Sequence, residues 1–135
     1  MKIAFLSVFY PYRGGIAQFN AALYRALEVN NQVKAFNFTV QYPNFLFPGK
    51  TQFVTPEDNV DEVPSERVLN AINPLSYKKT VASIKEFQPD LLILGYWMPF
   101  MGPSMGYIAK KIGKECRVLS IVHNAIPHET SRLDK

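Results

Sequence analysis

KIAFLSVFYPYRGGIAQFNAALYRAL, residues 2–27, joins a strand pattern, a glycine turn and a helix pattern in one short stretch. The run from Ile3 to Val8 is apolar at nearly every position, as in parallel strands that are covered on both faces. The apolar residues after the turn recur at helical spacing: Ile16, Phe19, Leu23 and Leu27. Between the two patterns, Gly14-Gly15 places backbone N–H groups at the positive end of a helix, where a phosphate or another anion can bind.

The rest of the chain continues this alternation of strand and helix patterns. Asn73 before Pro74 is typical of a helix start, and the following stripe of Leu75, Val81, Ile84 and Phe87 ends before Pro89. The other expected elements are strands at Val33–Phe38, Asp90–Tyr96 and Arg117–His123, and a helix at Pro103–Lys114. This order predicts an α/β fold, a Rossmann-like parallel sheet with helices on both faces.

Two connections have a different character. Asn30-Asn31 is expected to end the first helix, because asparagine tolerates the left-handed cap conformation. From Gln41 to Pro64 the sequence is irregular, acidic and rich in proline, with a short strand expected near Gln52–Val54. This segment is most simply a solvated loop.

Size and composition limit the class of protein. The chain has 135 residues, of which 47% are hydrophobic and 19% charged, so we expect one globular domain rather than a disordered segment. No apolar run approaches the ~20 residues of a membrane span, and no signal peptide is recognisable. The single cysteine, Cys116, suits a reducing cytoplasm, most simply as a small buried hydrophobe beside a strand. The net charge of +4 fits an anionic substrate or an acidic membrane surface, and we expect no nucleic-acid partner.

The glycine pair does not belong to the common nucleotide-binding motifs. The dinucleotide-binding fingerprint GxGxxG is not matched, because Gly14 is followed by Gly15, Ile16, Ala17, Gln18 and Phe19. The acidic residue that would bind a ribose is also missing, since Phe36–Thr39 contains no carboxylate. The P-loop motif GxxxxGK[ST] is not matched either, because Asn44 stands where the motif ending in Gly49-Lys50-Thr51 needs its first glycine. NAD binding and simple ATPase activity are therefore disfavoured, and a tight turn without a ligand remains the alternative for the two glycines.

The segments at the carboxyl ends of the expected strands carry the candidate site residues, because open parallel sheets bind ligands there. Gly14 and Gly15 are the candidate phosphate ligands, with Arg13 either a phosphate clamp or an ordinary exposed arginine. His123 is expected at the end of the last strand. Its side chain has either a catalytic role or a structural role as a cap of the strand end. Tyr96 and Trp97 offer aromatic faces on which a sugar could stack, or else pack against the protein.

Four of these features together resemble the N-terminal half of a GT-B glycosyltransferase of family 4 (group 1). They are the loop Pro11–Ala17, the helix pattern Ala22-Leu23…Ala26-Leu27, the strand opening Pro89–Leu92, and the strand end Val122-His123-Asn124. The resemblance extends from Lys2 to about Glu129. One departure is Asn31-Gln32-Val33, where the family usually has Gly-His-Val, and it affects only a turn.

The resemblance implies a retaining hexosyltransferase that generally needs no metal or other cofactor. It implies that the glycine loop, Gly15 above all, meets the diphosphate of a nucleotide-sugar donor and that His123 lies near the donor sugar. It assigns Gln18, Tyr96, Trp97 and Asn124 to the acceptor side, where a glycan or a lipid-linked sugar would bind. Residues 1–135 would then be a truncated N-terminal domain whose C-terminal donor-binding domain is absent, and this part alone would be inactive.

Other interpretations stay open at this point. The chain could be a non-catalytic module that binds a nucleotide or a phosphorylated ligand, or a protein–protein interaction domain that uses its aromatic loops. Lys110, Lys111 and Lys114 lie on one expected helix, either as a solvated face or as a peripheral contact with acidic lipids at the inner face of the membrane.

Overall fold

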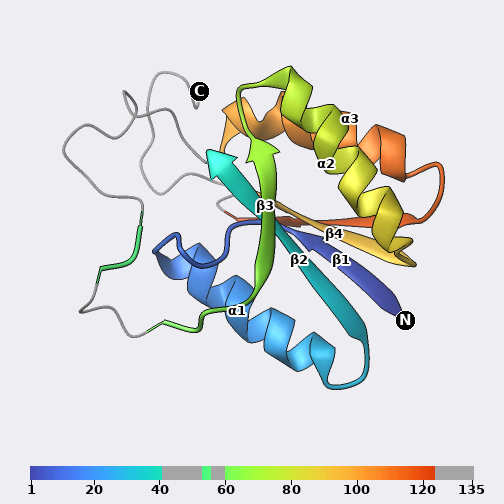
Figure 1. Cartoon of the computed structure of the whole chain (residues 1–135). Helices are drawn as coiled ribbons and strands as arrows, with labels where there is room; N and C mark the ends of the chain where they lie inside the picture. The colour runs from blue at the N-terminus through green and yellow to red at the C-terminus, as the bar shows by residue number, and fades with distance from the viewer. Residues whose placement is uncertain (41–52, 56–59, 124–135) are drawn as a thin grey trace.

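The computed structural model describes residues 1–40, 53–55 and 60–123, which form a five-stranded, all-parallel sheet with helices between strands (Figure 1). The strand order is β3-β2-β1-β4-β5. The strands are β1 (Lys2–Leu6), β2 (Gln32–Val40), β3 (Ser65–Asn70), β4 (Leu91–Tyr96) and β5 (Arg117–Val122). The helices are α1 (Gly15–Glu28), α2 (Pro74–Phe87), the short 3-10 helix η2 (Pro99–Met101) and α3 (Gly102–Ile112). The predicted Rossmann-like α/β fold is confirmed.

Helices cover both faces of this sheet, as the sequence pattern predicts. α1 lies on one face and the neighbouring helices α2 and α3 lie on the other (Figure 1). Two apolar clusters separate these layers. One joins Tyr24 of α1 to Phe5 of β1, and the other joins Ile84 and Ile108 of α2 and α3 to Leu92 of β4. No helix in the described ranges combines the length and apolar character needed to cross a bilayer.

The topology defines one preferred place for a ligand. From β1 the chain crosses to β2 on one side, whereas β4 pairs with β1 on the other side. Loops from the carboxyl ends of β1 and β4 therefore leave toward opposite faces of the sheet, at a topological switch point where open α/β sheets bind ligands. The glycine loop after β1 lies at this point.

Strand β3 was not predicted. Its sequence, SERVLN, alternates polar and apolar residues only weakly, and most of its positions are half-buried or exposed. It occupies a sheet edge and pairs with β2 through two register shifts. Edge strands need less apolar surface than central ones, so the hydrophobic pattern was too faint to reveal it.

The expected apolar stripe of α1 is confirmed in part: Ile16, Leu23 and Leu27 are half-buried and pack against the two clusters, but Phe19 is not part of this contact. The buried side chains of this helix are Ala17, Asn20, Ala21 and Tyr24, whereas Phe19 is 48% exposed. Small alanines bring the helix close to the sheet, and buried Asn20 is stabilised by hydrogen bonds. The large apolar residues therefore lie on the flanks of the contact.

Helix ends follow the expectations in part. Asn73 Oδ1 accepts a hydrogen bond from the Leu75 N–H at 3.0 Å, so the predicted N-cap of α2 is confirmed, although Leu75 itself is 70% exposed rather than buried. The left-handed cap expected at Asn30-Asn31 is wrong, because α1 ends at Glu28 with its C-cap residue Val29 in right-handed geometry, and neither asparagine has a positive φ. Instead, Asn31 Nδ2 donates to the Leu27 carbonyl at 2.9 Å.

The strand expected near Gln52–Val54 lies partly outside the described residues. Phe53 forms a single antiparallel bridge to Tyr12, and its ring stacks on the Tyr12 ring with centroids 5.0 Å apart. Arg67 of β3 lies over both rings and donates from Nε to the Phe38 carbonyl at 3.0 Å. These contacts attach residues 53–55 to the glycine loop.

Candidate functional site

The N-terminus of α1 is open and lacks a side-chain cap. Gly14 adopts φ 122° and ψ 172°, a conformation that essentially only glycine accepts. Among the described residues no side chain caps this terminus, and the first turn holds no acidic residue. A Cβ added at Gly14 or Gly15 would meet no heavy atom within 4 Å. The first N–H groups of α1 are therefore accessible to an anion, which the helix dipole would favour.

Asn37 holds the start of the glycine loop from β2. Its side chain is fully buried, and Oδ1 accepts from the Phe9 N–H at 3.3 Å and from the Phe38 N–H at 2.8 Å. Its Nδ2 lies within hydrogen-bond distance of the carbonyls of Phe9, at 3.1 Å, and Tyr10, at 3.0 Å. A single side chain thus replaces a strand partner for a loop that has left the sheet.

Asn20 holds the same loop from α1. Its Nδ2 donates to Ser7 Oγ at 2.7 Å and to the Val8 carbonyl at 2.9 Å. Ser7 in turn fills the space beside Gly95 of β4, where any Cβ would overlap it. Asn20 Oδ1 is buried and has no hydrogen-bond partner among the described residues. Two buried asparagines therefore fix the path of the loop that leads to Gly14.

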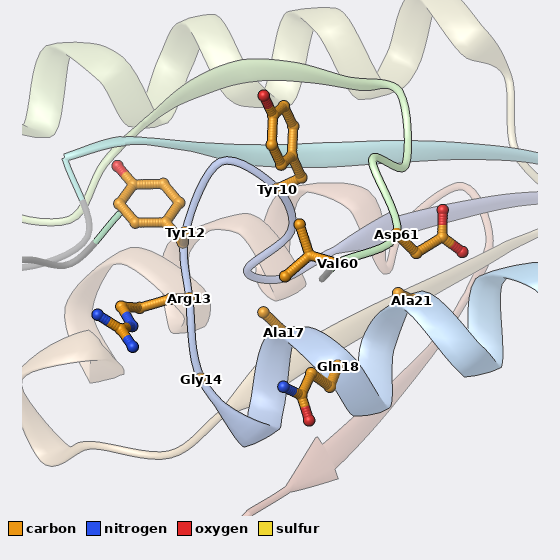
Figure 2. A pocket seen from close by; sticks show the side chains of 9 residues that line it. All are labelled: Tyr10, Tyr12, Arg13, Gly14, Ala17, Gln18, Ala21, Val60 and Asp61. Carbon is orange, nitrogen blue, oxygen red and sulfur yellow. The ribbon is translucent and has the colours of Figure 1, made fainter. Parts of the chain in front are cut away.

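A small cavity lies on the inner side of this loop (Figure 2). It brings together three predicted site residues, Arg13, Gly14 and Gln18, but its volume of about 20 Å³ admits little more than one water. Asp61 on its far side is paired with Arg25 at 2.7 Å. Arg13 extends away from this acidic side in Figure 2. An anion would therefore approach the outer side of Gly14 and Gly15 rather than enter the cavity.

His123 lies at the same edge of the sheet, beside α1. Its backbone N–H donates to the Tyr96 carbonyl at 2.8 Å and extends the β4–β5 ladder by one residue. Its ring meets the Phe19 ring edge-on, with centroids 5.3 Å apart, and the Trp97 ring at 6.3 Å. Phe19 is one helical turn beyond Gly15. The end of β5 and the glycine loop therefore face the same region above the sheet.

The chemistry of His123 is that of a neutral imidazole. Burial lowers the pKa of His123 below the ordinary 6.5, so the neutral ring dominates at pH 7. Its Nε2 is buried and has no hydrogen-bond partner in the described part of the chain. A neutral ring nitrogen of this kind can donate to or accept from a ligand hydroxyl, depending on its tautomer.

Of the predicted acceptor-side residues, Tyr96 and Trp97 pack in or against the core, and one residue lies outside the described part of the chain. Trp97 is only 6% exposed and packs edge-on against Phe38, with ring centroids 5.9 Å apart. Tyr96 is half-buried and packs against the α2–α3 side of the core. Asn124 lies outside the described residues. The acceptor roles of these three residues remain predictions.

Comparisons with family models, with curated proteins and with solved structures found no match. The fold and the site geometry therefore carry the functional argument. Within residues 1–40, 53–55 and 60–123, no group of three or more His, Cys, Asp or Glu side chains converges as metal ligands.

Sequence reasoning missed Asn20 and Asn37, which organise the site. The signal was present, since Asn37 stands between two phenylalanines in an apolar strand and Asn20 lies within a mostly apolar helix. A polar residue at a buried position needs hydrogen-bond partners, and here the partners are the backbone of the glycine loop.

Proposed function

We propose that this chain is the acceptor-side domain of a retaining glycosyltransferase, which moves a sugar from a nucleotide-sugar donor to a glycan or lipid-linked acceptor. The observation that carries the proposal is the uncapped start of α1 at Gly14, held at the switch point by Asn20 and Asn37. A site for a diphosphate needs N–H donors whose positions are fixed before the ligand arrives, because they then need no reorganisation during reaction.

In this proposal the glycine loop acts on the leaving group. As the glycosidic bond to the donor breaks, negative charge grows on the diphosphate, and the N–H groups after Gly14 stabilise that charge. Gly15 provides close approach, because no side chain covers the backbone there. His123 supplies a neutral imidazole that hydrogen-bonds a hydroxyl of the donor sugar. Gln18, Tyr96, Trp97 and Asn124 remain the proposed acceptor side.

The donor nucleotide would bind mainly to a C-terminal domain of the complete protein, as the resemblance implies. The proposed place of action is the cytoplasm, at the inner face of the membrane when the acceptor is lipid-linked.

The decisive experiment measures sugar transfer by the complete native protein from a panel of nucleotide sugars. Gly15→Leu is expected to lower transfer at least a hundredfold, because the side chain would cover the N–H groups. Gly106→Leu is the matched control, since Gly106 also lies in a helix with open space around a Cβ, but on the opposite face of the sheet. Equal transfer by the wild type and Gly15→Leu would overturn the role of the glycine loop.

The alternative of a non-catalytic phosphate-binding module has its own signature. The 135-residue chain would then bind nucleotide sugars by itself, with measurable heat in calorimetry. Heat of binding together with no transfer from any donor by the complete protein would replace the transferase proposal with this alternative.

A further inference from the structure

The outer face of the α2–α3 layer carries a concentration of positive charge. Between residues 74 and 117 the chain has seven basic and three acidic residues, a balance equal to the net charge of +4 of the whole chain. Elsewhere basic and acidic residues cancel. The lysines of this layer, here called the basic face, are Lys78, Lys79, Lys85, Lys110, Lys111 and Lys114.

The two helices that carry most of these lysines belong to one layer of the fold. α2 and α3 lie side by side and pack their buried residues on one face of the sheet (Figure 1). The Tyr77 and Tyr107 rings meet between them at 6.0 Å, and Lys111 lies over the Tyr107 ring. Lys78, Lys79, Lys85, Lys110 and Lys114 are exposed, and Lys111 is half-buried. The layer also carries acidic residues: Glu115 pairs with Lys85 at 3.6 Å, and Glu86 is exposed on α2.

One end of the basic face carries two exposed apolar side chains. Ile72 is 55% exposed and Leu75 is 70% exposed, and Leu75 lies one helical turn before Lys78 and Lys79. Exposed apolar side chains next to basic residues are the composition of surfaces that bind at a membrane interface.

The turn that presents Ile72 and Leu75 is fixed by its own hydrogen bonds. Asn70 Oδ1 accepts from the Ile72 N–H at 3.1 Å, and Asn73 Oδ1 accepts from the Leu75 N–H. Ser76 Oγ bonds both the N–H and the carbonyl of Asn70, each at 2.9 Å. Ile72 and Leu75, here called the apolar tip, are therefore held in a fixed turn. Inserting the apolar tip into a membrane interface would cost little conformational entropy.

We propose that the α2–α3 face docks on a membrane surface that contains acidic lipids. Ile72 and Leu75 enter the interface, and the lysines along the helices contact the anionic headgroups. Apolar insertion combined with electrostatic attraction is the usual basis of peripheral binding. This inference is independent of the proposed transferase activity, because it uses neither the glycine loop nor His123.

The test is co-sedimentation of the 135-residue chain with phosphatidylcholine vesicles, with and without about 30% phosphatidylglycerol. We expect binding only to the acidic vesicles, weakened by added salt. Lys78→Gln/Lys79→Gln should lower the partition coefficient about tenfold or more, and Leu75→Ser about threefold. Both sites are exposed, and circular dichroism would verify folding.

Two control variants separate the basic face from net charge. Lys78→Arg/Lys79→Arg keeps the charge and should bind like the wild type. Lys2→Gln/Lys34→Gln removes the same charge near the amino ends of β1 and β2 and should change binding less than twofold. Absence of vesicle binding, equal binding to neutral vesicles, or an equal loss in the Lys2/Lys34 variant would overturn the proposal. Unchanged binding by Leu75→Ser would overturn the insertion of the apolar tip. Retention on heparin without vesicle binding would assign the lysines to a soluble polyanion instead.

Discussion

The side chain of Asn37 pairs with the backbone of Phe9 as a neighbouring strand would, accepting from its N–H at 3.3 Å and donating to its carbonyl at 3.1 Å. Both residues are fully buried, so water cannot replace these bonds. The glycine loop thus depends on a residue 28 positions further along the chain. The loop is positioned by the fold of the whole sheet rather than by its own sequence.

Replacement of Asn37 by Ala should therefore destabilise the protein strongly. The N–H and carbonyl of Phe9 and the carbonyl of Tyr10 would lose their side-chain partner, and each unsatisfied buried group costs about 1–3 kcal/mol. We expect the free energy of unfolding to fall by about 3 kcal/mol or more. Urea denaturation followed by fluorescence of Trp97, the single tryptophan of the chain, measures this change.

Asn73→Ala provides the control for a surface asparagine. Its Oδ1 accepts one exposed hydrogen bond as the N-cap of α2, so the loss should be about 1 kcal/mol. A similar loss for Asn37→Ala and Asn73→Ala would contradict the structural role of the buried pair.

The two adjacent glycines should respond differently to alanine. Gly14 has φ 122°, so Gly14→Ala places a side chain in a strained conformation and should cost about 1–3 kcal/mol. Gly15 is the first residue of α1 and has open space around a Cβ, so Gly15→Ala should be neutral or slightly stabilising. Thermal unfolding of both variants measures the difference. Equal melting temperatures would show that the strained backbone at Gly14 relaxes readily.

Gly95 and Ser7 should be energetically coupled. A Cβ at Gly95 would overlap Ser7 Oγ and approach Ser7 Cβ at 2.9 Å, so Gly95→Ala should destabilise by more than about 2 kcal/mol. Ser7→Gly removes the obstructing atoms at the cost of the Asn20 bond. In a double-mutant cycle, Ser7→Gly/Gly95→Ala should be more stable than the sum of the single changes by about 1 kcal/mol or more. Strict additivity would mean that the sheet adjusts without involving Ser7.

Local signals in the sequence predicted much of the fold. Some features depend on a few consecutive residues and can be recognised without tertiary information. They are the N-cap at Asn73, the apolar strands and the glycine turn. The alternation of these elements then restricted the topology to a parallel layered sheet, which the structure confirms.

Features set by distant contacts were not predictable. β3 lacks a strong apolar pattern because it lies at the edge of the sheet and is identified mainly by its pairing with β2. Phe19 has the spacing of a core residue, yet its ring lies on the flank of α1 against His123. Asn20 and Asn37 hold the glycine loop through hydrogen-bond partners more than ten residues away in the sequence. The candidate site combines a turn that was recognised with supports that were not.

The last prediction concerns pH. Burial lowers the pKa of His123 in the folded protein, whereas in the unfolded chain it should return to about 6.5. Below that value the unfolded state binds more protons than the folded state, so the free energy of unfolding should decrease as the pH falls from 7.5 towards 5. His123→Gln removes this contribution, and its unfolding free energy should depend less on pH over the same range. An unchanged pH dependence in His123→Gln would mean that His123 is not the buried titrating group.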